Sequence, residues 1–286
     1  MTLLAVDIGN TETVVALYGK SGLGAPGQGD PGSLPPRDAA AACLNPDRVW
    51  RLASRRNVTG DELAVSIQML FDRSARRDTG ARELPERILI ASVVPTLNRP
   101  WSEAGAALGL QVRFLTGDCP LPVRLEVDNP REVGADRIAN TMAAAAIYAR
   151  DTLVVDLGTA ATFDCVSAGG AFLGGAIAPG PATAMEHLSK AAAQLPHAVL
   201  EEPARAIGKN TLACLASGGF YSVVSGIDGI VGRLITEWDL AAPPLVVATG
   251  GLAGRLAPHC AVIELTEPAL TVAGIALADR LLSESD

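Results

Sequence analysis

The sequence predicts an α/β fold built from two similar halves. The main observation is a unit that occurs twice, about half a chain apart, in residues 3–18 and 153–166. Each copy has an apolar strand, an aspartate, a glycine, hydroxyl residues and a second strand. Elsewhere, short apolar runs typical of buried strands alternate with longer helical patterns, as in α/β proteins. We therefore expect two domains, residues 1–148 and 149–286, with a ligand-binding cleft between them.

Composition and charge narrow the class of protein. The chain has 286 residues, of which 49% are hydrophobic and 19% are charged, so it can bury a sizeable core. Its formal net charge is −8 and no basic stripe stands out, so we expect no nucleic-acid partner. No uncharged apolar run approaches the length of about 18 residues that spans a membrane, so we expect no membrane segment. Five scattered cysteines without paired spacing indicate reduced thiols and a cytoplasmic protein.

The elements of the first half follow from periodicity and from breaker residues. Residues 1–19 predict a hairpin, and the glycine- and proline-rich residues 21–46 predict a long mobile loop or insertion. Thr59 and Glu62 have the spacing of a capping box, which predicts a helix that runs to about residue 75. The remaining predicted elements are strands at 49–52, 87–94 and 112–115 and helices at 97–108 and 134–148.

The second half repeats the pattern, with strands predicted at 153–156, 163–166 and 245–248 and helices at 182–194, 212–237 and 268–282. Its segment Gly208-Lys209-Asn210-Thr211 is similar to the tail of a P-loop. The leading glycine is absent, however, and Asn210 stands where a Ser or Thr is needed. We therefore reject a P-loop here.

The two repeated turns, Asp7 to Thr11 and Asp156 to Thr159, are candidate phosphate sites. A tight turn with Gly and Thr offers backbone N–H groups and hydroxyls to phosphate oxygens. An aspartate at its entrance can hold a cation, directly or through water. The first turn taken alone is ordinary hairpin chemistry. Its recurrence favours two turns that bind a nucleoside triphosphate from both sides.

Two further segments carry candidate site residues. Asp136 and Arg137 lie at a predicted helix start, where Asp136 is either an N-cap or a base for phosphoryl transfer. A helix N-terminus lowers the pKa of a carboxyl, which predicts a weak base. Arg137 either binds an anion or pairs with an acid. Gly250 and Gly251 follow a strand, and they suit either a close approach to adenine and ribose or a plain strand-to-helix turn.

Five segments, in this order, resemble the type III pantothenate kinase family of the actin/Hsp70/sugar-kinase superfamily. They are Asp7 to Thr11, Asn129 to Arg137, Asp156 to Thr159, Gly174 to Gly180, and Thr249 to Gly251. The resemblance implies duplicated ribonuclease-H-like (actin-like ATPase) domains with a nucleotide cleft between them. It also implies ATP-dependent phosphorylation of pantothenate to 4′-phosphopantothenate, the first step of coenzyme A synthesis.

The resemblance also implies roles for individual residues. Asp136 is the catalytic base, Asp7 lies near Mg²⁺, and Asp156 binds a monovalent cation, K⁺ or NH₄⁺. The residues implied to bind ATP are Asp7, Ile8, Gly9, Asn10, Thr11, Glu12, Thr13, Val14 and Thr159, and Gly250 and Gly251 join them on the argument above. The residues implied to contact pantothenate are Gly134, Ala135, Asp136, Arg137 and Thr211. Members of the family are homodimers.

The chain departs from the family pattern in two places. Ala161 stands where the family has a threonine, which predicts the loss of one hydroxyl contact to phosphate or cation. The insertion at 21–46 follows the first hairpin, and we expect it to cover part of the cleft. Two alternatives stay open: another small-molecule kinase or phosphatase of the superfamily that acts on a sugar or polyphosphate, and an ATP-binding regulatory protein with weak catalysis.

Overall fold

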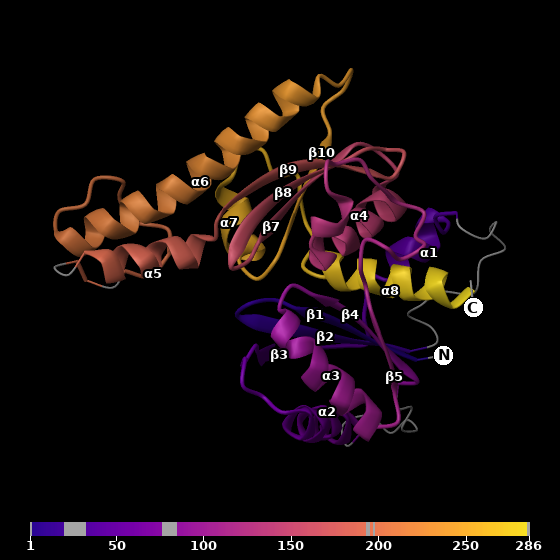
Figure 1. The fold of residues 1–286 in the computed structure, drawn as a ribbon. Coiled ribbons are helices and arrows are strands. Elements are labelled where there is room, and N and C mark those ends of the chain that lie inside the picture. Colours follow the sequence, from indigo (N-terminus) through magenta and orange to yellow (C-terminus); the bar gives the residue numbers. More distant parts are fainter. Residues whose placement is uncertain (1, 20–32, 76–84, 193–194, 197, 285–286) are drawn as a thin grey trace. The chain divides into compact units, whose positions relative to one another are not determined.

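The computed structural model describes residues 2–19, 33–75, 85–192, 195–196 and 198–284 (Figure 1). The chain forms two compact units. The first unit contains residues 1–149, 167–172 and 269–286, and the second contains residues 150–166 and 173–268. The predicted division into residues 1–148 and 149–286 differs from these units in the segments 167–172 and 269–286. The predicted cleft between the halves stays a prediction.

In chain order, the strands are β1 (Leu3–Ile8), β2 (Glu12–Tyr18), β3 (Arg48–Ala53), β4 (Arg87–Ser92), β5 (Gln111–Phe114), β6 (Arg124–Leu125), β7 (Thr152–Leu157), β8 (Ala160–Val166), β9 (Ala171–Pro179), β10 (Leu245–Thr249) and β11 (Leu265–Thr266). The helices are α1 (Arg37–Ala42), α2 (Gly60–Ala75), α3 (Pro95–Ala107), α4 (Ala135–Tyr148), α5 (Pro181–Ala191), α6 (Thr211–Trp238), α7 (Ala253–Leu256) and α8 (Leu270–Glu284), with 3₁₀ turns η1 (Pro130–Glu132) and η2 (Ala257–His259).

The first unit is built on a five-stranded sheet of order β3-β2-β1-β4-β5. Strand β1 pairs antiparallel with β2 and parallel with β4. Leu4, Val6 and Ile8 point toward α2 and α3, where they join one apolar cluster. Successive strand residues face opposite sides of a sheet, so Asp7 faces the side that α8 covers (Figure 1).

Helix α8 holds α4 in place within the first unit. The two helices approach closely because Gly274 has no side chain: a Cβ there would overlap the backbone of Ala139. Next to this crossing, the buried Thr271 hydroxyl donates to Asn140 Oδ1 at 2.9 Å. Helix α4 carries Asp136 in its first turn, so this crossing fixes the position of the predicted base.

A buried ion pair fixes α8 to the first sheet. Arg87 Nε of β4 lies 2.7 Å from Asp279 Oδ2 of α8. Burial raises the pKa of Asp279, and the Arg87 guanidinium opposes that rise. The pair therefore anchors the C-terminal helix to β4, at the cost of a desolvated carboxylate.

The second unit contains β7, β8, β10, β11 and most of β9 from the six-stranded sheet β11-β10-β7-β8-β9-β6. One sheet face carries Leu153, Val155 and Leu157, which pack in an apolar cluster with residues of α6 and α7. The opposite face carries Asp156. Among the described residues, α6 is the one helix long and apolar enough to cross a membrane, by length and composition alone. It packs Phe220, Val224 and Val231 into this cluster.

Most predicted elements are confirmed, and one expectation is wrong in part. The capping box exists: the Thr59 N–H donates to Glu62 Oε2 at 2.9 Å, and the Glu62 N–H donates to Thr59 Oγ1 at 3.2 Å. Residues 37–42 of the predicted loop form helix α1, because the run Asp38-Ala39-Ala40-Ala41-Ala42 has high helix propensity and Ala40 is buried. Residues 21–32 of that segment lie outside the described residues.

Candidate active site

The first turn follows β1 in the first unit. Gly9 N–H donates to Glu12 O at 3.0 Å, which closes a tight turn. Asn10 and Thr11 are exposed at its tip, and Asp7 is half-buried just before it. The turn therefore presents a carboxylate, backbone N–H groups and a hydroxyl together.

The end of the predicted 7–14 segment lies in strand β2 and has protein partners. Glu12 forms an ion pair with Arg51 of β3. Thr13 is buried, and its hydroxyl lies 2.8 Å from that of Ser54. Val14 lies within β2, opposite Asp7. These side chains stabilise the hairpin that carries the turn.

The segment with Asp136 lies beside the first turn. Val93 N–H donates to Ile8 O at 3.1 Å, so the end of β4 runs alongside the end of β1. The Val93 side chain in turn lies against Gly134, where a Cβ would be 3.5 Å from Val93 Cγ1. Val93 therefore contacts both Ile8, which follows Asp7, and Gly134, which lies two residues before Asp136.

The N-terminus of α4 is shaped around the Asp136 carboxylate. The N-cap is Gly134, not Asp136, and Asp136 Oδ1 accepts the Arg137 N–H at 2.8 Å. A Cβ on Gly134 would lie only 2.5 Å from Asp136 Oδ1, so a side chain there would displace the carboxylate. The Arg137 guanidinium lies over the Phe172 ring, 4.9 Å from its centroid, which holds the cation near the helix start.

The direction of the pKa shift at Asp136 differs from the sequence-based expectation. Burial raises its pKa, and the hydrogen bond from the Arg137 N–H and the charge of Arg137 only oppose that rise. The expected lowering by the helix N-terminus was therefore wrong, because desolvation is the larger effect. A carboxylate with a raised pKa is a stronger base, which suits the predicted role.

The second turn lies in the second unit and is contacted by two other segments, one at Gly180 and one at Gly250. Gly158 N–H donates to Ala160 O, two residues further on, at 3.0 Å, whereas Gly9 in the first turn donates to the carbonyl three residues further on. Gly180, before α5, lies against the backbone of Gly158 and Thr159, and the Thr183 hydroxyl donates to Thr159 O at 2.9 Å. The turn is thereby fixed, while Thr159 itself stays exposed.

Gly250 lies directly against Asp156. It has a left-handed backbone (φ 89°), and a Cβ there would overlap both Asp156 Oδ1 and the Leu157 backbone. Leu252 N–H donates to Leu157 O at 3.1 Å, which joins this glycine turn to the second repeated turn. The structure therefore brings together Asp156, Gly250 and Gly251, which the sequence places almost a hundred residues apart.

Ala161 does not face this site. Its side chain is buried with Leu157 and Phe163 in the apolar cluster of the second unit. The expected loss of a hydroxyl contact at this position was therefore wrong, because the side chain points into the core. Thr162, the next residue, lies on the Asp156 side of the sheet.

Thr211 is the first residue of α6 and is exposed. The helix is capped by Asn210, whose Oδ1 accepts the Ala213 N–H at 2.9 Å. This cap explains why asparagine stands where a P-loop needs a hydroxyl residue. Thr211 belongs to the second unit and Asp136 to the first, and their placement at one substrate stays a prediction.

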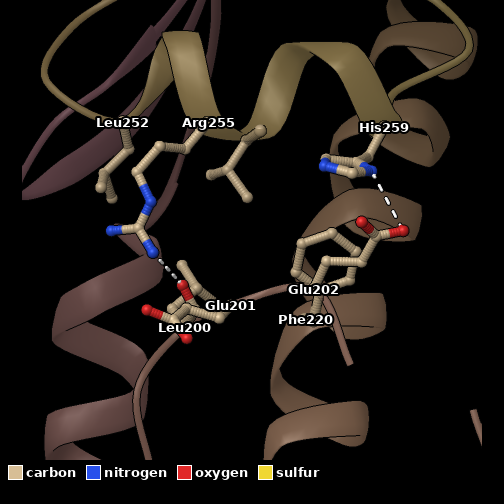
Figure 2. A pocket seen from close by; sticks show the side chains of 8 residues that line it. Leu200, Glu201, Glu202, Phe220, Leu252, Arg255 and His259 are labelled. Atoms are coloured by element: carbon tan, nitrogen blue, oxygen red, sulfur yellow. Dashed lines mark hydrogen bonds and ion pairs between the residues drawn. The ribbon is translucent and has the colours of Figure 1, made fainter. Parts of the chain in front are cut away.

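A separate pocket of about 260 Å³ lies beneath α7 in the second unit (Figure 2). Arg255 Nη2 donates to Leu200 O at 2.5 Å, and His259 Nδ1 lies 3.7 Å from Glu202 Oε1. The His259 ring also packs edge-on against Phe220. These groups partner one another across the pocket and hold residues 200–202 against α7, so we assign them a structural role.

Comparison with known sequences decides the family. The sequence model of the type III pantothenate kinases matches residues 3–233. The chain belongs to the type III pantothenate kinase family. A type III pantothenate kinase from Moorella thermoacetica is 36% identical over 274 residues, which cover 96% of each chain. One from Saccharopolyspora erythraea is 37% identical over 278 residues, which cover 96% of this chain and 97% of the relative.

Solved structures show the same fold. A conserved putative Baf family transcriptional activator from Campylobacter jejuni matches this pantothenate kinase family member with a TM-score of 0.53 and 19% identity, over 99% of this chain and 98% of the other. An ethanolamine utilization protein from Carboxydothermus hydrogenoformans matches with the same TM-score and 16% identity, over 97% of this chain and 90% of the other. The predicted actin-like, duplicated ribonuclease-H-like fold class is confirmed.

Sequence reasoning missed the residues that support the two turns. Val93 and Thr183 belong to segments that the sequence presented only as a strand end and a helix start, while Gly180 ends a segment that was singled out only for its family resemblance. Thr183 gave no local signal, since its role depends on a turn 24 residues away. The Pro-Gly pair at 179–180 was a usable signal, because such a pair marks a turn, and helix α5 begins directly after it.

Proposed function

We propose that this kinase transfers the γ-phosphoryl group of ATP to the 4′-hydroxyl of pantothenate and so begins coenzyme A synthesis. The observation that carries the proposal is the family match over residues 3–233, a range that contains Asp136 and both repeated turns. The site's chemistry agrees with that reaction, since it combines backbone N–H groups for phosphate with a carboxylate of raised pKa for a hydroxyl.

In this proposal Asp136 accepts the hydrogen of the attacking hydroxyl and orients its oxygen. Phosphoryl transfer asks mainly for positioning, and the fixed carboxylate at the start of α4 supplies it. Gly134, Ala135 and Thr211 complete the contacts to pantothenate. The Arg137 guanidinium, held over Phe172, is suited to the substrate carboxylate.

ATP would bind to both turns. Asp7 to Thr11 and Thr159 would donate to phosphate oxygens, and Gly250 and Gly251 would leave room for the nucleoside. Glu12 to Val14 act through the hairpin that they stabilise. The kinase family uses ATP with a divalent metal, and we propose Mg²⁺.

The residues present fit two cations. Asp7 is a half-buried carboxylate at the entrance of a turn, which suits Mg²⁺ held directly or through water. Asp156 is cradled by Gly250, and the nearby Thr249 hydroxyl is buried without a hydrogen-bond partner among the described residues, which suits K⁺ or NH₄⁺. Bound cations would neutralise phosphate charge, while the turns orient the phosphates.

We also propose that the enzyme is a cytoplasmic homodimer, as the family resemblance implies. The dimer is supported by α6, an apolar helix in which only 28% of the most apolar 18-residue stretch is buried. Leu212 and Tyr221 of this helix are 49% and 41% exposed. Light scattering on the purified protein tests the dimer: a monomeric mass at micromolar concentration would contradict it.

The reaction is tested by measuring ADP release from Mg-ATP with and without pantothenate, in potassium and in sodium buffer. The proposal predicts release that depends on pantothenate and on potassium or ammonium. A sugar and polyphosphate are matched alternative acceptors. Turnover with either of them, and none with pantothenate, would refute the substrate assignment.

A further inference from the structure

We infer that the hydroxyl of Thr249 is an oxygen ligand, together with Asp156, of a monovalent cation bound in the second unit. The inference rests on the proposed function for the presence of a cation at Asp156. It goes beyond that proposal by assigning a second protein ligand from a different strand, 93 positions further along the chain.

Strand register places the two side chains next to each other. In the parallel pair β7 and β10, Thr249 lies opposite Asp156. Partners in register point to the same sheet face, and this face is opposite the one that packs against α6 and α7. Thr162 of β8 is the register partner of Asp156 on its other side. Three oxygen-bearing side chains, Thr162, Asp156 and Thr249, therefore lie in one row across three neighbouring strands.

The Thr249 hydroxyl is buried and makes no hydrogen bond to the described residues. Its residue is only 1% exposed, and its Oγ1 has no hydrogen-bond partner among the described residues. A buried hydroxyl without a partner destabilises a fold, so natural proteins keep one mainly where a ligand or water completes it. By contrast, the hydroxyl of Thr152, on the same face of β7, donates to Arg150 O at 2.8 Å.

The charge beside this hydroxyl selects a cation over an anion. Asp156 is an acidic residue, and Gly250 brings backbone rather than a side chain against its Oδ1. No group of three or more His, Cys, Asp or Glu side chains with metal-binding geometry occurs in the described part of the chain. A cation here would therefore need neutral oxygens in addition to one carboxylate, and the Thr249 lone pairs provide one. With a lone pair on the cation, the hydroxyl proton points away from it.

The test compares the full-length wild type with Thr249→Val, which keeps the shape and removes the hydroxyl. Thermal unfolding is followed in potassium chloride and in choline chloride of equal ionic strength, over a range of concentrations. We expect potassium to raise the Tm of the wild type. Thr249→Val should require about tenfold more potassium for the same rise, as expected for one lost ligand contact. In choline chloride the variant should be at least as stable as the wild type, because an unsatisfied hydroxyl is gone.

Two variants separate this effect from simple damage. Thr249→Ser keeps the hydroxyl and should restore the potassium response. Thr152→Val removes a hydroxyl that has a protein partner, so it should lower the Tm equally in both salts and leave the potassium midpoint unchanged. Thallium-205 NMR gives a second readout of cation binding that does not depend on turnover.

The outcomes distinguish this inference from the proposed function. An unchanged potassium midpoint in Thr249→Val would overturn the role of Thr249, even if the wild type turns over pantothenate. A wild type without any potassium-specific Tm rise would overturn it as well. Pantothenate-dependent ADP release, measured separately, decides the proposed reaction in either case.

Discussion

Replacing Asp136 with asparagine should separate catalysis from folding. The new side chain keeps an Oδ1 that can accept the Arg137 N–H, as the carboxylate oxygen does at 2.8 Å, so the start of α4 should persist. The variant loses the base, and general-base catalysis contributes about 10²–10⁴-fold, or roughly 3–5 kcal/mol of transition-state stabilisation. We expect kcat to fall by that factor while the KM for ATP changes little, measured by coupled ADP release.

The same variant has a stability signature that follows from the raised pKa. In the folded protein Asp136 holds its proton to a higher pH than in the unfolded chain. Stability therefore falls as pH rises from the unfolded pKa through the folded one, and ionised Asp136 destabilises the fold at neutral pH. We expect Asp136→Asn to be at least as stable as the wild type at pH 7. The wild-type kcat/KM should decline on the acid side at a pH above the ordinary aspartate value.

Asp279→Asn is the matched control, because burial raises the pKa of both carboxyls. Losing the charge partner of Arg87 should lower the Tm, while the remaining folded enzyme keeps its kcat. The reasoning about Asp136 would be refuted if Asp136→Asn retained near-normal kcat. It would also be refuted if kcat and Tm fell together, as in a folding defect.

Three further substitutions test the supporting geometry. Gly250→Ala should raise the KM for ATP about tenfold and lower the free energy of unfolding by about 1–3 kcal/mol. The φ of 89° disfavours a side chain, and the new Cβ would displace Asp156. An unchanged KM for ATP would contradict this. Gly274→Ala should push α8 away from α4 and lower the Tm, since overpacking lowers the free energy of unfolding by about 1–3 kcal/mol. It should lower kcat more than it lowers ATP affinity. An unaltered Tm in calorimetry would refute the close crossing. Ala161→Thr should leave ATP affinity unchanged in titration calorimetry, because residue 161 faces the apolar cluster; a tighter Kd would place it in the site.

The sequence predicts those features that depend on local pattern. The repeated turns, the Thr59–Glu62 capping box and the glycine after β10 are each encoded within a few residues, and the structure confirms their local form. Helix α1 was missed because its alanine run lies in a segment dominated by glycine and proline. There, composition suggested a loop, while burial of Ala40 favoured a helix.

Features that depend on distant segments are not predictable in this way. The raised pKa of Asp136 comes from desolvation by the surrounding fold, while sequence position alone suggests only the helix dipole. The inward direction of Ala161 follows from the register of β8 with β7, which a single hydroxyl-rich motif does not reveal. The grouping of α8 with the first unit depends on Gly274 and the Arg87–Asp279 pair, which join residues far apart in the chain.

The central claim is that this chain phosphorylates pantothenate, and mass spectrometry of the reaction products tests it most directly. Purified enzyme is incubated with Mg-ATP, potassium and pantothenate, and phosphorylated pantothenate and ADP are quantified together. We expect 4′-phosphopantothenate and ADP in equal amounts, with both formed at least about a hundredfold more slowly by Asp136→Asn. ADP formed without phosphorylated pantothenate would contradict the claim.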